Sequence, residues 1–190
     1  MKNQSITEAM LQFIEESPTA FHAAANVEAL LLENGFEKLE NLAEGALVPG
    51  GSYYTMQNGS AVLAVKIPEN PAKGFRIAAS HSDSPCFKIK EVPEMKVENT
   101  YVKLNVEKYG GMILSPWLDR PLSVAGRVFV AGKDGKPEVK LVNLKKDLLI
   151  IPNVAIHFNR EINNGFAYNP QTDMAPLMGL DQELSIKKLC

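Results

Sequence analysis

The residues best suited to chemistry are His81 and Asp83, which lie two positions apart in a polar segment at residues 81–85. An apolar run at residues 75–79 precedes them and has the length and composition of a buried strand, although Arg76 interrupts it. In open α/β sheets, sites form just beyond the carboxyl ends of strands. The pattern therefore predicts a strand that delivers this His and this Asp to a functional edge of a sheet.

A metal site is the chemistry that these two side chains favour. The imidazole of His81 can bind a metal, and the carboxylate of Asp83 can fix the imidazole ring or share the ligation. Taken alone, the pattern has a simpler interpretation, in which both side chains cap a turn before Pro85. Ser82 and Ser84 also make a serine hydrolase possible, but no nucleophile-elbow motif supports it, and we rank it far below a metal site.

The sequence offers few further ligands for such a metal. A zinc site needs three or four nitrogen, oxygen or sulfur ligands, and His22 and His157 are the two other histidines. The sequence has no His-Glu-x-x-His, Cys-x-x-Cys or Gly-rich phosphate-binding motif. Any additional ligands must therefore be carboxylates.

Three other positions have both a structural and a functional interpretation. His22 lies on a predicted helix beside an aromatic residue, where we expect a packing or surface role. Residues 117–120 contain Trp117 and an Asp-Arg pair, which favours a pinned turn over an interface element. His157 follows an apolar stretch and is expected at a strand end, where a histidine on its own is more often structural than catalytic.

Composition excludes several classes of partner. The chain has 190 residues, of which 45% are hydrophobic and 22% are charged, and its net charge is -2, so we expect no nucleic-acid partner. No apolar run approaches the roughly 20 residues that span a bilayer, and the first residues do not form a signal peptide. Two distant cysteines, Cys86 and Cys190, give no disulfide framework. We therefore expect a cytoplasmic protein without a membrane partner.

The first 90 residues predict the start of an α/β domain. Residues 5–16 form an amphipathic helix pattern that begins with a capping box, and residues 19–34 form a second helix pattern that ends before Gly35. Two strand patterns then flank Asn58 and Gly59, a pair that favours a type I′ hairpin turn.

Residues 91–190 change character and predict a second, β-rich domain, which we expect to be incomplete. Strand patterns occur at residues 87–90, directly before this boundary, and at residues 102–106, 127–130, 138–142, 147–151 and 154–157. Residues 166–178 contain two prolines and predict a loop, and residues 179–190 could form a helix.

Several segments, taken together and in this order, resemble one family. They are residues 17–22, 79–90, 109–128, 151–160 and 169–173. They are similar to segments of the M18 family of metallo-aminopeptidases, the aspartyl aminopeptidase type, and the resemblance extends over nearly the whole chain to about Leu180.

This resemblance implies a zinc-dependent exopeptidase that removes one N-terminal residue, commonly Asp or Glu, from a peptide with a free N-terminus. Two metal ions activate a bridging water in such enzymes, and a Glu acts as the general base. His81 matches the first metal ligand. Asp83 and His157 match catalytic residues: Asp83 is the carboxylate that supports that ligand, and His157 is a histidine that reaches toward the active site of a partner subunit.

The resemblance also implies an α/β fold, namely the start of a zinc-exopeptidase-like catalytic domain followed by a β-rich inserted dimerisation domain that builds homo-oligomers. Family chains are much longer, and their remaining metal ligands follow that inserted domain. We therefore expect this sequence to be an N-terminal portion that is inactive alone. The alternative is a non-enzymatic oligomerisation or regulatory fragment that associates with full-length subunits.

Overall fold

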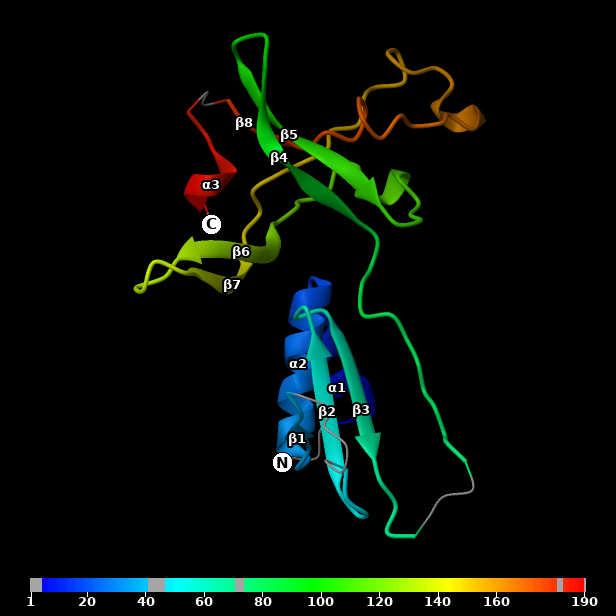
Figure 1. Ribbon diagram of the computed structural model, residues 1–190. Helices are drawn as coiled ribbons and strands as arrows, with labels where there is room; N and C mark the ends of the chain where they lie inside the picture. Colours follow the sequence, from blue (N-terminus) through cyan, green and yellow to red (C-terminus); the bar gives the residue numbers. More distant parts are fainter. Residues whose placement is uncertain (1–4, 41–46, 71–73, 181–182, 190) are drawn as a thin grey trace. The chain divides into compact units, whose positions relative to one another are not determined.

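The computed structural model describes residues 5–40, 47–70, 74–180 and 183–189. Its elements form two compact units (Figure 1). The first unit consists of Met1–Asp83 and Gly126–Leu141, and the second consists of Ser84–Ala125 and Val142–Cys190. The predicted domains, 1–90 and 91–190, stay a prediction, because the grouping into compact units does not test them.

Two helices open the first unit, and both begin where the capping residues predict. Helix α1 spans Ile6–Glu15 and has the capping box, in which the Ser5 hydroxyl accepts from the Glu8 amide at 3.2 Å. Helix α2 spans Ala20–Glu33 with Thr19 as its N-cap. Gly35 follows α2 with a φ of +76°, the left-handed conformation that glycine adopts readily. Both predicted helices are therefore confirmed.

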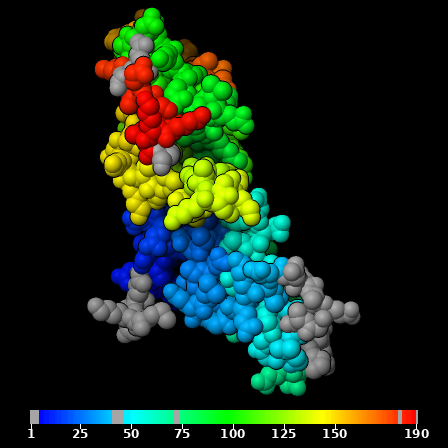
Figure 2. Space-filling view, turned by 60° about the vertical axis from the view of Figure 1, so that its left-hand side comes forward, coloured from blue at the N-terminus to red at the C-terminus, as the bar shows by residue number. Residues whose placement is uncertain are grey.

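A three-stranded sheet packs beside α2, in the order β1-β2-β3. Strand β1 (Glu37–Lys38) runs parallel to β2 (Ser52–Gln57), and β2 pairs antiparallel with β3 (Ala61–Lys66). Asn58 and Gly59 join β2 to β3 with φ values of 53° and 67°, as a type I′ turn requires. The predicted hairpin is confirmed, and Figure 2 shows the blue surface of α2 beside the cyan surface of these strands.

Two hydrogen bonds to a single carboxylate oxygen connect this sheet to helix α2. The Tyr54 hydroxyl donates to the Glu28 carboxylate at 2.9 Å, and the Lys38 ammonium donates to the same oxygen at 2.7 Å. Tyr54 is buried on β2, Glu28 lies on α2 and Lys38 lies on β1. The three residues therefore connect three elements of the first unit through a single carboxylate.

The predicted strand at residues 75–79 is wrong. These residues belong to no helix or strand, and the side chains of Phe75 and Ile77 are 89% and 86% exposed. A strand exists only when a neighbour accepts its backbone hydrogen bonds, and no described strand pairs with this run. The run is drawn as an extended trace that leads from residue 74 toward β4 (Figure 1).

A two-stranded hairpin completes the first unit. Strands β6 (Ala125–Ala131) and β7 (Pro137–Asn143) pair with each other, and Gly132 and Gly135 lie in the loop between them. The two strands confirm the strand patterns predicted at residues 127–130 and 138–142. Although the hairpin lies in the β-rich half of the sequence, its residues 126–141 group with the first unit.

The second unit is built on a sheet in the order β4-β5-β8. Strands β4 (Cys86–Val97), β5 (Tyr101–Tyr109) and β8 (Leu177–Gly179) pair antiparallel. Two 3-10 helices, η1 (Ser115–Trp117) and η2 (Ile162–Asn164), and the short helix α3 (Ile186–Leu189) complete it. One hydrophobic cluster in the core of this unit is formed by the buried residues Leu104, Val106, Leu149 and Ile186.

Three predictions for the second unit need correction. Residues 147–151 form two isolated bridges, Leu122 with Leu149 and Ile150 with Leu177, in place of a strand. Residues 154–157 form no strand, because the Phe158 amide bonds back to the Ala155 carbonyl at 2.8 Å and turns the chain. Within the described part of residues 179–190, only Ile186–Leu189 is helical. None of the described helices is long and apolar enough to cross a membrane.

Candidate functional site

The structure brings His81 and Asp83 together. Nδ1 of His81 lies 2.9 Å from Oδ1 of Asp83 and 2.9 Å from the backbone carbonyl oxygen of Asp83. A carbonyl oxygen can only accept a hydrogen bond, so Nδ1 is the nitrogen that carries the proton. In the neutral ring, Nε2 is then the nitrogen with a free lone pair, which is the form that ligates a metal.

The His81 side chain is also accessible. It is 82% exposed, whereas the Asp83 side chain is 37% exposed. A carboxylate that holds Nδ1 of an exposed histidine, and so leaves Nε2 available, is the arrangement of a histidine ligand with its supporting carboxylate. The predicted pairing of these two residues is therefore present in the structure, although no strand carries it.

A neighbouring hydrogen bond attaches this segment to the β2–β3 hairpin. The Ser82 hydroxyl donates to the backbone carbonyl of Ser60 at 3.0 Å. Ser60 directly follows the type I′ turn, so the segment at residues 81–83 is attached to a well-defined turn. The same bond argues against Ser82 as a nucleophile, because its hydroxyl donates to a carbonyl and not to an imidazole.

The donor set fits one metal ligand and its support. Among the described residues, no group of three or more His, Cys, Asp or Glu side chains could hold a metal ion. Zinc needs three or four ligands. His81 and Asp83 therefore fit a part of a zinc site, and the rest of the coordination sphere would have to come from outside the described residues.

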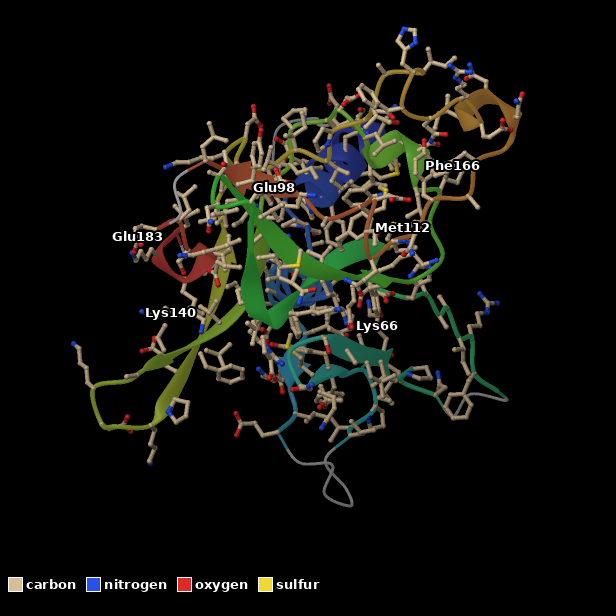
Figure 3. All side chains as sticks on the ribbon, turned by 90° about the horizontal axis from the view of Figure 1, so that it is seen from above. Lys66, Glu98, Met112, Lys140, Phe166 and Glu183 are labelled. Carbon is tan, nitrogen blue, oxygen red and sulfur yellow. The ribbon has the colours of Figure 1, made fainter. Side chains whose placement is uncertain are left out.

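His157 lies in the second unit, away from any strand. It is exposed in a turn of the loop that precedes η2, next to Phe158, whose side chain is 85% exposed. Figure 3 shows this loop, in orange with Phe166, extending outward from the strands of its unit. The predicted strand-end position of His157 is wrong, and the structure provides an exposed loop histidine.

The other two candidates have structural roles. His22 Nδ1 lies 2.8 Å from the Thr19 hydroxyl at the start of α2, and burial lowers the pKa of His22. Trp117 packs edge-on against Phe87, with ring centroids 5.0 Å apart. Both observations agree with the structural interpretation of these positions.

The predicted Asp119–Arg120 pair does not form. The Asp119 carboxylate accepts from the Asn153 amide at 2.9 Å, and the described residues contain no ion pair between Asp119 and Arg120. The turn at residues 117–120 is therefore stabilised by the contact of Trp117 with Phe87 and by the hydrogen bond from Asn153 to Asp119.

Sequence reasoning missed the residues that hold the candidate site. Ser60 is 22 residues from Ser82, and Arg127, which donates to Asn58 in the turn before Ser60, is 69 residues from Asn58. Neither contact has a local sequence pattern. Only the Asn58-Gly59 turn itself could be recognised from the sequence.

The chain matches a known family over most of its length. The model of the family described as aminopeptidase I zinc metalloprotease (M18) matches residues 13–189. A protein of Clostridium acetobutylicum named probable M18 family aminopeptidase 2 is 47% identical over 184 residues, which are 95% of this chain and 42% of the relative. The protein of the same name from Pseudomonas putida (strain GB-1) is 40% identical over 176 residues, which are 92% of this chain and 41% of the relative.

Solved structures agree with these relatives. The solved structure named "Structure of Chaetomium thermophilum mApe1" matches with a TM-score of 0.81 and 34% identity, over 93% of this chain and 40% of that chain. A chain from "Cryo-EM structure of the Ape4 and Nbr1 complex" matches with a TM-score of 0.84 and 37% identity, over 93% of this chain and 34% of that chain. This chain thus spans about two fifths of the length of the curated relatives.

Proposed function

Because this chain belongs to the M18 family of zinc metalloproteases, we propose that it supplies part of a metal-dependent aminopeptidase, with His81 as a metal ligand. The observation that carries the proposal is the geometry of His81, whose Nδ1 is held by Asp83 at 2.9 Å and whose side chain is 82% exposed. We further propose zinc as the metal, in a two-metal site that other residues complete.

The residues of this chain have distinct roles in that site. Bound zinc would supply Lewis-acid polarisation of the scissile carbonyl and an activated water. His81 would hold the metal through Nε2. Asp83 accepts a hydrogen bond from Nδ1 of His81 and so fixes the orientation of the ring. His157 would act on the substrate in a neighbouring subunit, where a donor to the developing oxyanion lowers the reaction barrier.

The substrate and the assembly are also part of the proposal. We propose peptides with a free N-terminal Asp or Glu as substrates, and a cytoplasmic homo-oligomer built through the β-rich part of the chain. One solved structure that shares the fold is named "Structure of S. cerevesiae mApe1 dodecamer", which supports an assembled form. The exposed apolar side chains of the His157 loop, including Ile156 and Phe158, are suited to an interface.

The 190-residue chain alone is expected to be inactive, because its described residues contain no group of three metal-ligating side chains. The test therefore uses a chimera, in which residues 1–190 are joined to the part of the Clostridium acetobutylicum relative that this chain does not match. We call this protein the completed enzyme.

The decisive variant is His81→Ala in the completed enzyme, and His22→Ala is the matched control because His22 lies in a helix cap. We expect zinc-dependent cleavage of Asp and Glu aminoacyl substrates by the completed enzyme. A chelator and the His81→Ala substitution should each abolish this activity, and the His22→Ala variant should retain it. Full activity of His81→Ala would overturn the site assignment.

The alternative, an oligomerisation or regulatory fragment, makes a different prediction. In that case the isolated 190-residue chain would co-purify with the full-length relative and change its specific activity, and His81→Ala in the fragment would have no effect. A fragment that stays separate from the full-length relative excludes the alternative.

A further inference from the structure

We infer that the turn at residues 58–60 positions the segment at residues 81–83, and that Arg127 is a positioning residue because it holds this turn. The inference rests on the proposed function, since it concerns the placement of the proposed ligand His81. All of these residues belong to the first unit.

The segment that carries His81 is not itself part of a helix or strand. Residues 75–85 lie outside every helix and strand of the structure, and the side chains of residues 75–82 are exposed. The bond from the Ser82 hydroxyl to the Ser60 carbonyl, 3.0 Å long, joins the segment to a regular element. Since Ser82 lies between His81 and Asp83, this bond acts at the centre of the candidate site.

The acceptor of that bond lies in a turn of fixed geometry. Asn58 and Gly59 both have positive φ values, 53° and 67°, and the Ser60 amide donates to the Gln57 carbonyl at 3.2 Å. Two residues in the left-handed region leave the backbone of a type I′ turn little freedom. The direction of the Ser60 carbonyl is therefore set by the turn.

Arg127 holds the opposite side of the same turn. Its Nη1 donates to the Asn58 carbonyl at 2.9 Å and to the Asn58 side-chain oxygen at 3.3 Å. The guanidinium carbon lies 4.1 Å from the ring centroid of Phe21 on α2 and 5.4 Å from that of Phe129 on β6. One side chain thus connects the hairpin β6–β7, helix α2 and the turn.

The chemistry of this contact is specific to arginine. A planar guanidinium can stack on aromatic rings and donate hydrogen bonds in its plane at the same time, whereas a lysine ammonium cannot reproduce both contacts. Metal ligands must be held within roughly 0.5 Å of their productive positions. The chain of contacts from Arg127 through Asn58 and Ser60 to Ser82 is therefore suited to hold His81 in place.

The test measures backbone order in the 190-residue chain by ¹⁵N relaxation, so it needs no metal and no activity. We expect order parameters of about 0.85 at residues 81–83 in the parent, and values below about 0.6 in Ser82→Ala. Ser82→Thr keeps the hydroxyl and should restore them. Arg127→Lys should lower the order at residues 58–60 and at residues 81–83 together.

Two matched controls remove the same chemical groups at positions without these contacts. Ser84→Ala removes a hydroxyl from the same polar segment, and Lys133→Ala removes a positive charge from the loop of the β6–β7 hairpin. Neither should change the order at residues 81–83. Unshifted amide resonances of α1, which belongs to the first unit and makes none of the tested contacts, show that the first unit is folded in each variant.

A second readout links the contact to the metal. In the completed enzyme, Ser82→Ala should weaken zinc binding about three- to tenfold, the effect of one hydrogen bond, and Ser82→Thr should restore the affinity. Order parameters at residues 81–83 that are equal in Ser82→Ala, Arg127→Lys and the controls overturn the inference. Equal order parameters would leave the proposed function intact, because they do not concern metal binding. Zinc binding that is independent of His81 would refute the proposed function, and it would not change the order parameters.

Discussion

Replacing Asp83 by Asn tests how this carboxylate supports His81. In the structure, Nδ1 of His81 has two acceptors at 2.9 Å, the carboxylate of Asp83 and the backbone carbonyl of the same residue. The substitution removes the negative charge but keeps the carbonyl and an amide oxygen. The proton therefore stays on Nδ1, and the main loss is electrostatic.

The size of the effect follows from this geometry. Loss of the carboxylate partner of a metal-bound histidine typically weakens metal binding by about 10- to 100-fold. Because a second acceptor remains on Nδ1, we expect the lower end of that range, about tenfold, which corresponds to about 1.4 kcal/mol. Asp83→Ala also keeps the carbonyl, so its effect should lie within about threefold of that of Asp83→Asn.

The assay is a competition titration of the completed enzyme with a chromophoric zinc chelator, at a pH where histidine is neutral. Glu33→Gln, on the exposed end of α2, is the control for loss of one negative charge. Zinc affinity that is unchanged in both Asp83→Asn and Asp83→Ala would refute the supporting role of this side chain. A loss confined to Asp83→Ala would show that hydrogen bonding, and not charge, is what the residue contributes.

Three further predictions concern the two units and the loop histidine. Leu104→Ala, at a fully buried core position, should destabilise the second unit by about 2–5 kcal/mol. Leu180→Ala, at a position of the same unit that is 64% exposed, should cost less than about 1 kcal/mol. Urea unfolding followed by fluorescence of Trp117, the single tryptophan, reports the second unit and measures both variants. The hydrogen bond from Lys38 holds the pKa of Glu28 below its ordinary value of 4.5. The ionised Glu28 therefore stabilises the folded chain above pH 4.5, and this stabilisation is lost as the pH falls through the lower pKa of the folded state. Glu28→Gln should therefore remove about 0.5–1 kcal/mol of stability near neutral pH, a small effect because the Lys38 side chain is 43% exposed and screened by solvent. The substitution should also flatten the acid limb of the curve of stability against pH. An acid limb as steep as that of the parent contradicts this prediction. His157→Ala in the completed enzyme should lower kcat by about 10²- to 10³-fold with little change in KM, and an unchanged kcat would exclude a catalytic role.

The sequence predicted the elements whose signals are local. Ser5 and Glu8 lie three residues apart, and their reciprocal hydrogen bonds begin α1 as the capping box requires. Asn58 and Gly59 are adjacent, and their positive φ angles close the β2–β3 hairpin. His81 and Asp83 are two residues apart, so their contact also needs no distant partner.

The failures have the opposite character. Residues 75–79 are apolar enough for a strand, but a strand needs a neighbour, and the composition of five residues cannot identify one. Residues 154–157 are equally apolar, and a turn bond from Phe158 to Ala155 decides their conformation. The contact between Arg127 and Asn58 joins positions 69 residues apart, and no local pattern records such a contact.

The most direct test of the proposed metal site is a zinc-bound crystal structure of the completed enzyme, with anomalous scattering to locate the metal. We predict that Nε2 of His81 lies about 2.0–2.1 Å from a zinc ion and that Asp83 still accepts a hydrogen bond from Nδ1. An occupied zinc centre from which the His81 ring is turned away would contradict the account.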